Sequence, residues 1–321
     1  MNISTTLTTI DVPGELDGQR LDRVLAHCLS GYSRSRIAKW VKTGRVTVDG
    51  VAVRPSTSVI AGQVITIDMP AAEPSTIVPQ AMDLDVVYDD AHLIVVNKPV
   101  GLVVHPGAGH PDQTLVNGLV ERFGTLSPVG APLRPGIVHR IDAGTSGLLV
   151  VARTEQCHTH LAAQFSAHQV ERVYQALAWD HGLDDTGTIE TDYGRHPKDR
   201  RKFTGQLPAH RRAITHWQVL ERVRPCVWTE VRLETGRTHQ IRVHFSEAGQ
   251  PLVGDPMYGR RRRVEHLPQL RRLGWELGLK RQALHAATLG FTHPATSEFI
   301  RFEVPPPEDL ARVLDCLRAV Q

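Results

Sequence analysis

The chain has 321 residues, long enough for one large domain and a smaller one. With 41% hydrophobic and 22% charged residues it has the composition of a folded globular protein, which excludes a disordered chain. It contains no run of about 18 apolar residues, and its N-terminus lacks the features of a secretory signal. We therefore expect a cytoplasmic protein without a membrane partner. The net charge of +3 does not indicate nucleic-acid binding, but the distribution of the basic residues does.

The first part of the chain predicts a small domain. Residues 1–14 are expected to be a flexible tail, and residues 15–68 a compact unit. Apolar residues recur at helical spacing from Leu21 and again from Ile37, which predicts two short helices. Asp49-Gly50 separates two β-type runs and predicts a hairpin, and Val64–Ile67 indicates a further strand.

The second helix of this domain is basic. Its cationic residues, and one just beyond its end, are Arg34, Arg36, Lys39, Lys42 and Arg45. When only the charges are considered, a solvated helix surface is the simplest explanation of this pattern.

Residues 69–82 are rich in proline and small polar residues, which predicts a linker to a large domain over 83–321. Two helices are expected in that domain, Leu115–Phe123 and Glu155–Ala167. They alternate irregularly with apolar, strand-like runs, which are Val86–Tyr88, Leu93–Val96, Val138–Val151, Tyr174–Trp179 and Cys226–Leu233. This order indicates an α+β fold and not a regular βαβ winding.

Two arginine-rich segments interrupt the large domain. The first runs from Arg195 to Lys202 and continues to Arg211-Arg212; the second comprises Arg260–Arg263, Arg271-Arg272 and Lys280-Arg281. Such runs are commonly solvated, but two of them beside a candidate site match the electrostatic footprint of an RNA cleft.

We expect neither a metal nor a cofactor. The four cysteines are far apart and form no CxxC pair, which argues against disulfides and a zinc site. His158 and His160 are two apart on an expected helix, do not share a face, and are interpreted as surface residues. The chain has no Walker loop and no GxGxxG motif after a strand.

The most informative stretch is Gly136–Thr154, which places Asp142 on a polar turn between two apolar runs. A turn aspartate often only caps the backbone. However, a charge between buried strands is usually paired or functional, and His139 and Arg140 stand beside it. Asp142 is therefore the candidate catalytic residue.

This stretch resembles the His-Arg-Leu-Asp signature of the RluA-type pseudouridine synthases, with Ile141 in place of leucine. Ala143 and Gly144 depart from the charged pair common after the aspartate. Further matching segments are Asn97–Gly107, Glu234–His244 and Pro251–Gly259, and residues 20–50 resemble an S4 RNA-binding domain.

The resemblance implies a mixed, largely antiparallel catalytic sheet, a monomer, and isomerisation of uridine to pseudouridine, which neither gains nor loses atoms. It implies that Asp142 is the essential carboxylate, that Arg242 pairs with it through a bidentate fork, and that Tyr174 stacks on the uracil or helps remove the C5 proton. The residues expected to contact RNA are Arg140, His139, Lys98, Leu252, Arg34, Arg36, Lys39 and Arg45.

The likeness further implies 23S rRNA as the partner, with the uridines of the helix 69 hairpin as targets. Another rRNA site or a tRNA loop is an alternative, because these motifs report chemistry and not the target. A non-catalytic RNA-binding assembly factor is a second alternative. A glycosidase-like hydrolase would need a second carboxylate, for which Glu234 is the nearest candidate.

Overall fold

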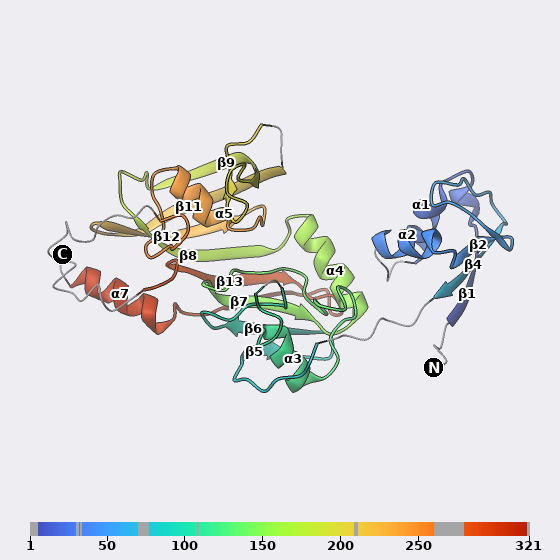
Figure 1. The fold of residues 1–321 in the computed structure, drawn as a ribbon, viewed down its shortest axis with the longest axis horizontal. Coiled ribbons are helices and arrows are strands. Elements are labelled where there is room, and N and C mark those ends of the chain that lie inside the picture. Colours follow the sequence, from blue (N-terminus) through green and yellow to red (C-terminus); the bar gives the residue numbers. More distant parts are fainter. Residues whose placement is uncertain are drawn as a thin grey trace.

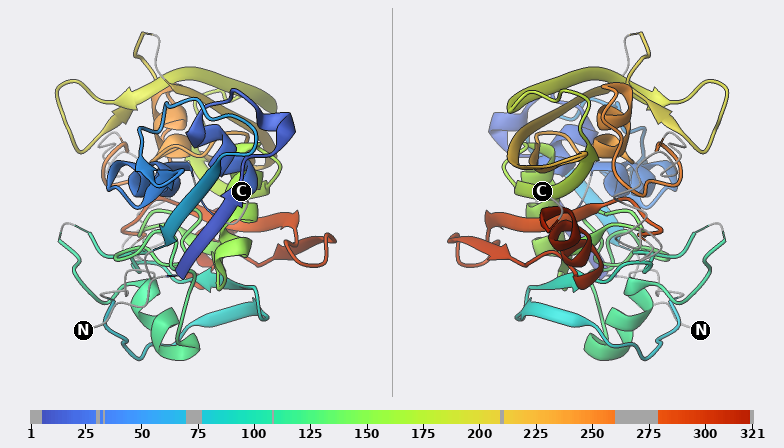
Figure 2. Two further views of the ribbon diagram at one scale, coloured as in Figure 1. Left: turned by 90° about the vertical axis from the view of Figure 1, so that its right-hand side faces the viewer. Right: turned by 90° about the vertical axis from the view of Figure 1, so that its left-hand side faces the viewer.

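The computed structural model describes residues 6–29, 32, 34–69, 77–107, 109–208, 211–259 and 279–319. Two sheets with separate apolar cores divide the chain into a small N-terminal and a large C-terminal domain (Figure 1). Figure 2 views the molecule from its two ends, with the small domain in front in one view and the helix α7 (Glu308–Arg318) in front in the other.

The small domain packs two helices, α1 (Leu21–Cys28) and α2 (Arg34–Lys42), together with a 4-stranded sheet. Its strands, in the order β1-β4-β2-β3, are β1 (Thr6–Asp11), β4 (Val64–Met69), β2 (Val46–Val48) and β3 (Val51–Ala52). The predicted helices and hairpin are confirmed. Asp49 and Gly50 have φ of 50° and 79°, the two positive values that a tight hairpin turn requires.

The expected tail and linker are both shorter in the structure. Thr6–Asp11, predicted as tail, forms an edge strand antiparallel to β4, and its high content of β-branched residues suits a strand. Ile77, expected in the linker, is buried in the large core, and Asn117 Nδ2 donates to the carbonyl of Val78. Residues 70–76 lie outside the described part of the chain.

The large domain is built on a 10-stranded sheet in the order β10-β9-β11-β12-β8-β13-β7-β6-β5, with β14 paired to β13. Within the described sheet, β13 and β7 run parallel and the other pairs antiparallel, so the expected mixed, largely antiparallel α+β fold is confirmed. The strands are β5 (Asp85–Asp89), β6 (Leu93–Lys98), β7 (Ser146–Ala152), β8 (Glu171–Trp179), β9 (Thr186–Arg195), β10 (Phe203–Thr204), β11 (Arg211–Val223), β12 (Cys226–Leu233), β13 (Leu284–Thr292) and β14 (Phe299–Glu303).

The helices α3 (Leu115–Phe123) and α4 (Glu155–Ser166) confirm the two predicted helices, and α5 (Gln240–Glu247) is an additional one. The strand expected from Val138 begins only at Ser146, because the polar turn before it is not extended. Arg211 and Arg212, expected in a basic loop, start the long strand β11.

His158 is buried, so the interpretation as a surface residue is wrong for this histidine, whereas His160 is exposed. The reason is that α4 lies against β7 and β13, with Cys157 and Leu161 also facing the sheet. Among the described residues, no helix is long and apolar enough to cross a membrane.

Candidate active site

Asp142 lies on a turn that is fixed from two directions. The amide of Thr145 donates to the carbonyl of Asp142 at 3.0 Å, which closes the turn. The next carbonyl, that of Ala143, accepts from the amide of Gly101 at 2.8 Å and from Lys98 Nζ at 3.2 Å. The aspartate therefore stands on a rigid backbone, as a positioned catalytic group requires.

The strand that follows the turn packs unusually close to β13. Gly147 has φ of 108°, and a Cβ at this position would lie 2.2 Å from the carbonyl oxygen of Ala286. Glycine is therefore required where the parallel strands β7 and β13 meet, and this contact places the Asp142 turn beside β13.

The side chains of Lys98 and Leu252 are both buried, so neither is exposed at the surface in this structure, and their contact with RNA stays a prediction. Lys98 is 0% exposed, and Leu252 is 1% exposed and forms a backbone bridge to Ala178. Besides Ala143, Lys98 Nζ donates to the carbonyls of Pro99 and Leu102. Burial lowers the pKa of Lys98 to about 7, although the nearby Asp142 opposes the shift.

Arg242 on α5 joins Asp142 to a second carboxylate, Asp255. Its Nη1 donates to Asp142 Oδ2 at 2.8 Å, whereas Nε and Nη2 donate to Asp255 Oδ2 and Oδ1 at 2.7 and 3.0 Å. The expected ion pair between Arg242 and Asp142 exists, but the bidentate fork is directed to Asp255. The prediction of a bidentate pair with Asp142 is wrong, because Asp255 takes the Nε–Nη2 edge of the guanidinium and Asp142 accepts from Nη1 alone.

Arg242 and Asp255 each favour the charged form of the other. Burial alone would lower the pKa of Arg242, but its ion pairs with Asp255 and Asp142 outweigh burial and raise it. Burial opposes ionisation of Asp255, but Arg242 and the amides of Tyr258 and Met257 hold its pKa below the usual range. One guanidinium therefore bridges the two carboxylates.

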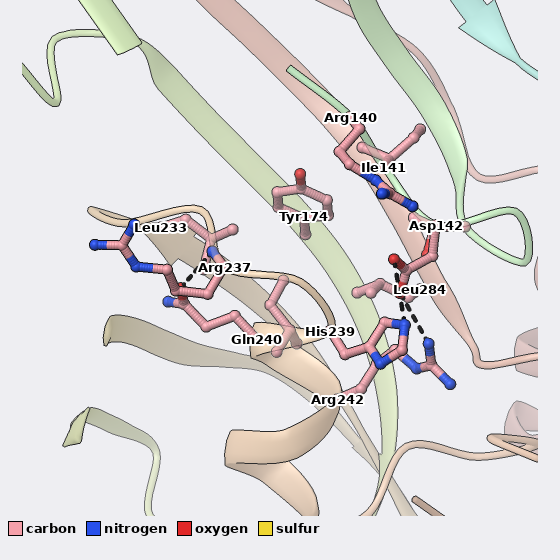
Figure 3. Close-up of a pocket in the computed structure, with 12 residues that line it drawn as sticks. Arg140, Ile141, Asp142, Tyr174, Leu233, Arg237, His239, Gln240, Arg242 and Leu284 are labelled. Atoms are coloured by element: carbon pink, nitrogen blue, oxygen red, sulfur yellow. Dashed lines mark hydrogen bonds and ion pairs between the residues drawn. The ribbon is translucent and has the colours of Figure 1, made fainter. Parts of the chain in front are cut away.

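His239 faces the other oxygen of Asp142 (Figure 3). Its Nε2 lies 3.8 Å from Oδ1, and its Nδ1 is 2.9 Å from the Tyr258 hydroxyl. That hydroxyl also accepts from the amide of Phe203, so Tyr258 links His239 to β10. Burial lowers the pKa of His239, which keeps the ring neutral against the opposing effect of Asp142.

Figure 3 shows that Asp142, Arg140, Tyr174 and Arg242 converge on one small pocket of about 50 Å³. Asp142, Arg140 and Tyr174 also line an adjoining cleft of about 490 Å³. Tyr174 comes from β8 and is 8% exposed. Burial raises the pKa of its phenol, so the hydroxyl stays protonated at neutral pH.

Arg140 is exposed at the mouth of this pocket, whereas the neighbouring His139 is used inside the fold. His139 Nε2 accepts from the amide of Val150 at 3.0 Å, and its ring stacks on Phe165. Burial lowers the pKa of His139 to about 3, which suits a neutral acceptor that ties the turn to β7. His139 also borders the cleft, so its contact with RNA stays a prediction.

The other basic residues expected to bind RNA differ in exposure and in their ion pairs. Lys39 is exposed on α2, but Arg45 forms an ion pair of 2.9 Å with Asp68. The side chains of Arg34 and Arg36 lie outside the described residues, as do residues 260–278 of the second basic segment. Arg281, expected in that segment, is 6% exposed and pairs with Asp309, because it fastens α7 to the sheet.

Sequence reasoning missed Asp255, His239 and Tyr258 as parts of the site, although all three lie in the segments that carried the resemblance. A carboxylate inside the mostly apolar Pro251–Gly259 segment was the available signal. Among the described residues no group of three or more histidines, cysteines or carboxylates is arranged to hold a metal ion.

Comparison with known proteins identifies the class. A model of the RNA pseudouridylate synthase family matches residues 92–247, and a model of the S4 domain matches residues 19–65. A solved structure, human RNA pseudouridylate synthase domain containing 1, covers 77% of this chain and 98% of its own, with a TM-score of 0.54 and 26% identity.

Curated relatives match almost the whole chain. It is 44% identical to ribosomal large subunit pseudouridine synthase D of Pseudomonas aeruginosa over 308 residues, which span 96% of this chain and 95% of the relative. It is 43% identical to the uncharacterized RNA pseudouridine synthase YlyB of Bacillus subtilis, over 95% and 96% of the two chains. The chain therefore belongs to the RluA-type RNA pseudouridine synthases and is an isomerase with an N-terminal S4 domain.

Proposed function

We propose that this enzyme converts uridines of the helix 69 hairpin in 23S rRNA to pseudouridine. Several relatives that share 43–45% of its residues are named ribosomal large subunit pseudouridine synthase D, which supports a large-subunit rRNA substrate. The S4 domain and the basic residues around the cleft support a structured RNA.

The observation that carries the proposal is the Asp142 carboxylate, which offers one oxygen to the pocket. Oδ2 accepts from Arg242, whereas Oδ1 accepts no hydrogen bond from a described residue. The reaction breaks the C1′–N1 bond, turns the uracil and joins C5 to C1′; C5 loses a proton and N1 gains one. An ionised Asp142 acts in it either as the nucleophile or by stabilising positive charge on the sugar.

Tyr174 and Arg140 have supporting roles in this proposal. The raised pKa of Tyr174 favours a stacking contact with the uracil over removal of the C5 proton by a phenolate. Arg140, exposed beside the pocket, is suited to hold the phosphate of the extruded nucleotide. Extrusion is required because the reacting atoms cannot be reached inside a stacked helix.

Replacement of the carboxylate tests the mechanism. Asp142→Asn keeps the shape of the side chain but removes its charge, so turnover is expected to fall by on the order of 10⁴-fold or more. RNA affinity is expected to stay close to that of the wild type. Pseudouridine is measured by mass spectrometry after incubation with unmodified large-subunit particles, and turnover near the wild-type rate would refute the assignment.

The same assay tests the target. New pseudouridines confined to the helix 69 hairpin support the proposed site. Conversion of another rRNA uridine or of a tRNA uridine keeps the chemistry but overturns the target. Binding without conversion of any RNA would favour an assembly factor.

A further inference from the structure

A second cavity of about 350 Å³ lies beside the Asp142 cleft. We call it the arginine pocket, because Arg195, Arg211 and Arg237 line it together with Tyr193 and Phe203. Residues 236–238 form part of the wall of both this pocket and the cleft. The two spaces are therefore neighbours around one short loop, the loop that leads into α5.

The arginine pocket carries positive charge that the described residues leave unbalanced. No carboxylate lines it. Arg195 Nη1 donates to the carbonyl of Arg200, and Arg237 donates to the carbonyl of Arg212, which are neutral acceptors. Arg211 is exposed and forms no ion pair with a described residue. Three guanidinium groups from different elements thus face a space that suits an anion.

The same pocket has an aromatic wall. The rings of Phe203 and Tyr193 stack with centroids 5.9 Å apart and planes inclined by 10°, and the Arg195 guanidinium lies 5.2 Å from the Phe203 centroid. Because the amide of Phe203 donates to Tyr258, which contacts His239, this wall is connected to the Asp142 site. Flat aromatic and guanidinium surfaces beside positive charge are typical of single-stranded RNA sites.

We propose that the arginine pocket is a second nucleotide subsite, which holds a nucleotide of the substrate strand close to the extruded uridine. Its phosphate binds Arg211 and Arg195, and its base lies against the Phe203 wall. This inference rests on the proposed function, because it takes the Asp142 pocket as the place of the target uridine. The shared wall of residues 236–238 is the reason to place the occupant on the same strand.

The test compares Arg211→Ala with Arg224→Ala in the full-length enzyme. Both side chains are exposed, but Arg211 begins the 13-residue strand β11 and Arg224 follows its end, roughly 40 Å away in an extended strand. With a helix 69 hairpin RNA, Arg211→Ala is expected to raise Kd and KM by about threefold to tenfold. It should reduce the salt dependence of binding by about one phosphate contact and leave kcat unchanged. Arg224→Ala should behave like the wild type.

Equal affinities and salt dependences of the two variants would overturn the subsite. A second test replaces single phosphates near the target by neutral methylphosphonates. At one linkage this should abolish the difference in affinity between wild type and Arg211→Ala. If the difference in affinity survives at every linkage, the subsite is overturned as well. Free uridine monophosphate can be used as a competitor of the hairpin. If it binds through Arg211 as strongly as the hairpin does, the occupant of the pocket is a free nucleotide and not the substrate strand. If no RNA is converted but Arg211→Ala still binds more weakly than Arg224→Ala, the proposed function fails and the subsite stands.

Discussion

At the scale of single residues, the geometry around Arg242 explains why an arginine stands there. Three of its N–H groups are used, two on Asp255 and one on Asp142. Asp255 is itself held by the amides of Met257 and Tyr258, so it fixes the plane of the guanidinium. This fixed plane directs an N–H of Nη1 toward Asp142. An ammonium group is a point charge and cannot serve both carboxylates in this geometry.

Arg242→Lys is therefore expected to lower turnover by on the order of 100-fold or more, because an ammonium group cannot keep both the buried Asp255 and the half-buried Asp142 paired. Single-turnover pseudouridine formation at saturating RNA measures the effect. Arg222→Lys is the matched control, since Arg222 also bonds two aspartates, Asp180 and Asp185, on a half-exposed part of the surface. Equal loss in the two variants, or near-normal turnover of Arg242→Lys, would remove Arg242 from the mechanism.

At the scale of elements, the contact of α4 with the sheet buries His158 and lowers its pKa. His158 is 7% exposed, its Nδ1 has no hydrogen-bond partner among the described residues, and burial lowers its pKa to about 4. The same direction holds for His244 on α5, whose pKa burial also lowers to about 4. Both rings are neutral in the native protein at pH values where the unfolded chain takes up protons.

The free energy of unfolding should therefore fall as the pH falls from about 6.5 toward 4. For one such histidine the loss at pH 5 is about 2 kcal/mol, from 1.5 pH units at about 1.36 kcal/mol each. His158→Leu removes one of these groups and should make the dependence between pH 7 and 5 shallower in urea unfolding. His160→Gln, an exposed position on the same helix, should leave the slope unchanged. A wild-type slope in His158→Leu would contradict the argument.

At the scale of the whole molecule, the two domains have separate cores. The apolar cluster of the small domain runs from Val12 to Ile67, and the large core takes its first residue from Ile77. This separation means that the small domain can be removed without opening the large core. Its contribution to RNA binding can therefore be measured by itself.

Deletion of residues 1–76 should leave a folded catalytic domain that binds rRNA more weakly and with a smaller salt dependence. The slope of log K against log salt becomes shallower by about 0.7 to 0.9 for every phosphate that the protein no longer neutralises. Affinity measured between 50 and 200 mM salt tests this. If the slope is unchanged, the small domain is structural only.

The sequence by itself determined the family, the fold class and most of the elements. These depend on local pattern: apolar periodicity predicts α3 and α4, the Asp49-Gly50 pair predicts a hairpin, and the motif around Asp142 is contiguous. It missed the extent of β9 and β11, because β9 has mostly exposed and half-buried residues and lacks the apolar run of a buried strand. The Thr6–Asp11 strand was missed because only its pairing with β4 distinguishes it from a tail.

Only the tertiary structure decided which charges meet. Arg242 lies 100 residues from Asp142 and 13 from Asp255, and no local pattern states that its fork faces the nearer carboxylate. The burial of Lys98 beneath the turn and the convergence of Arg195, Arg211 and Arg237 on one pocket likewise depend on how distant segments pack. Electrostatic interactions act through space, so the chain supplies the groups and the fold selects their partners.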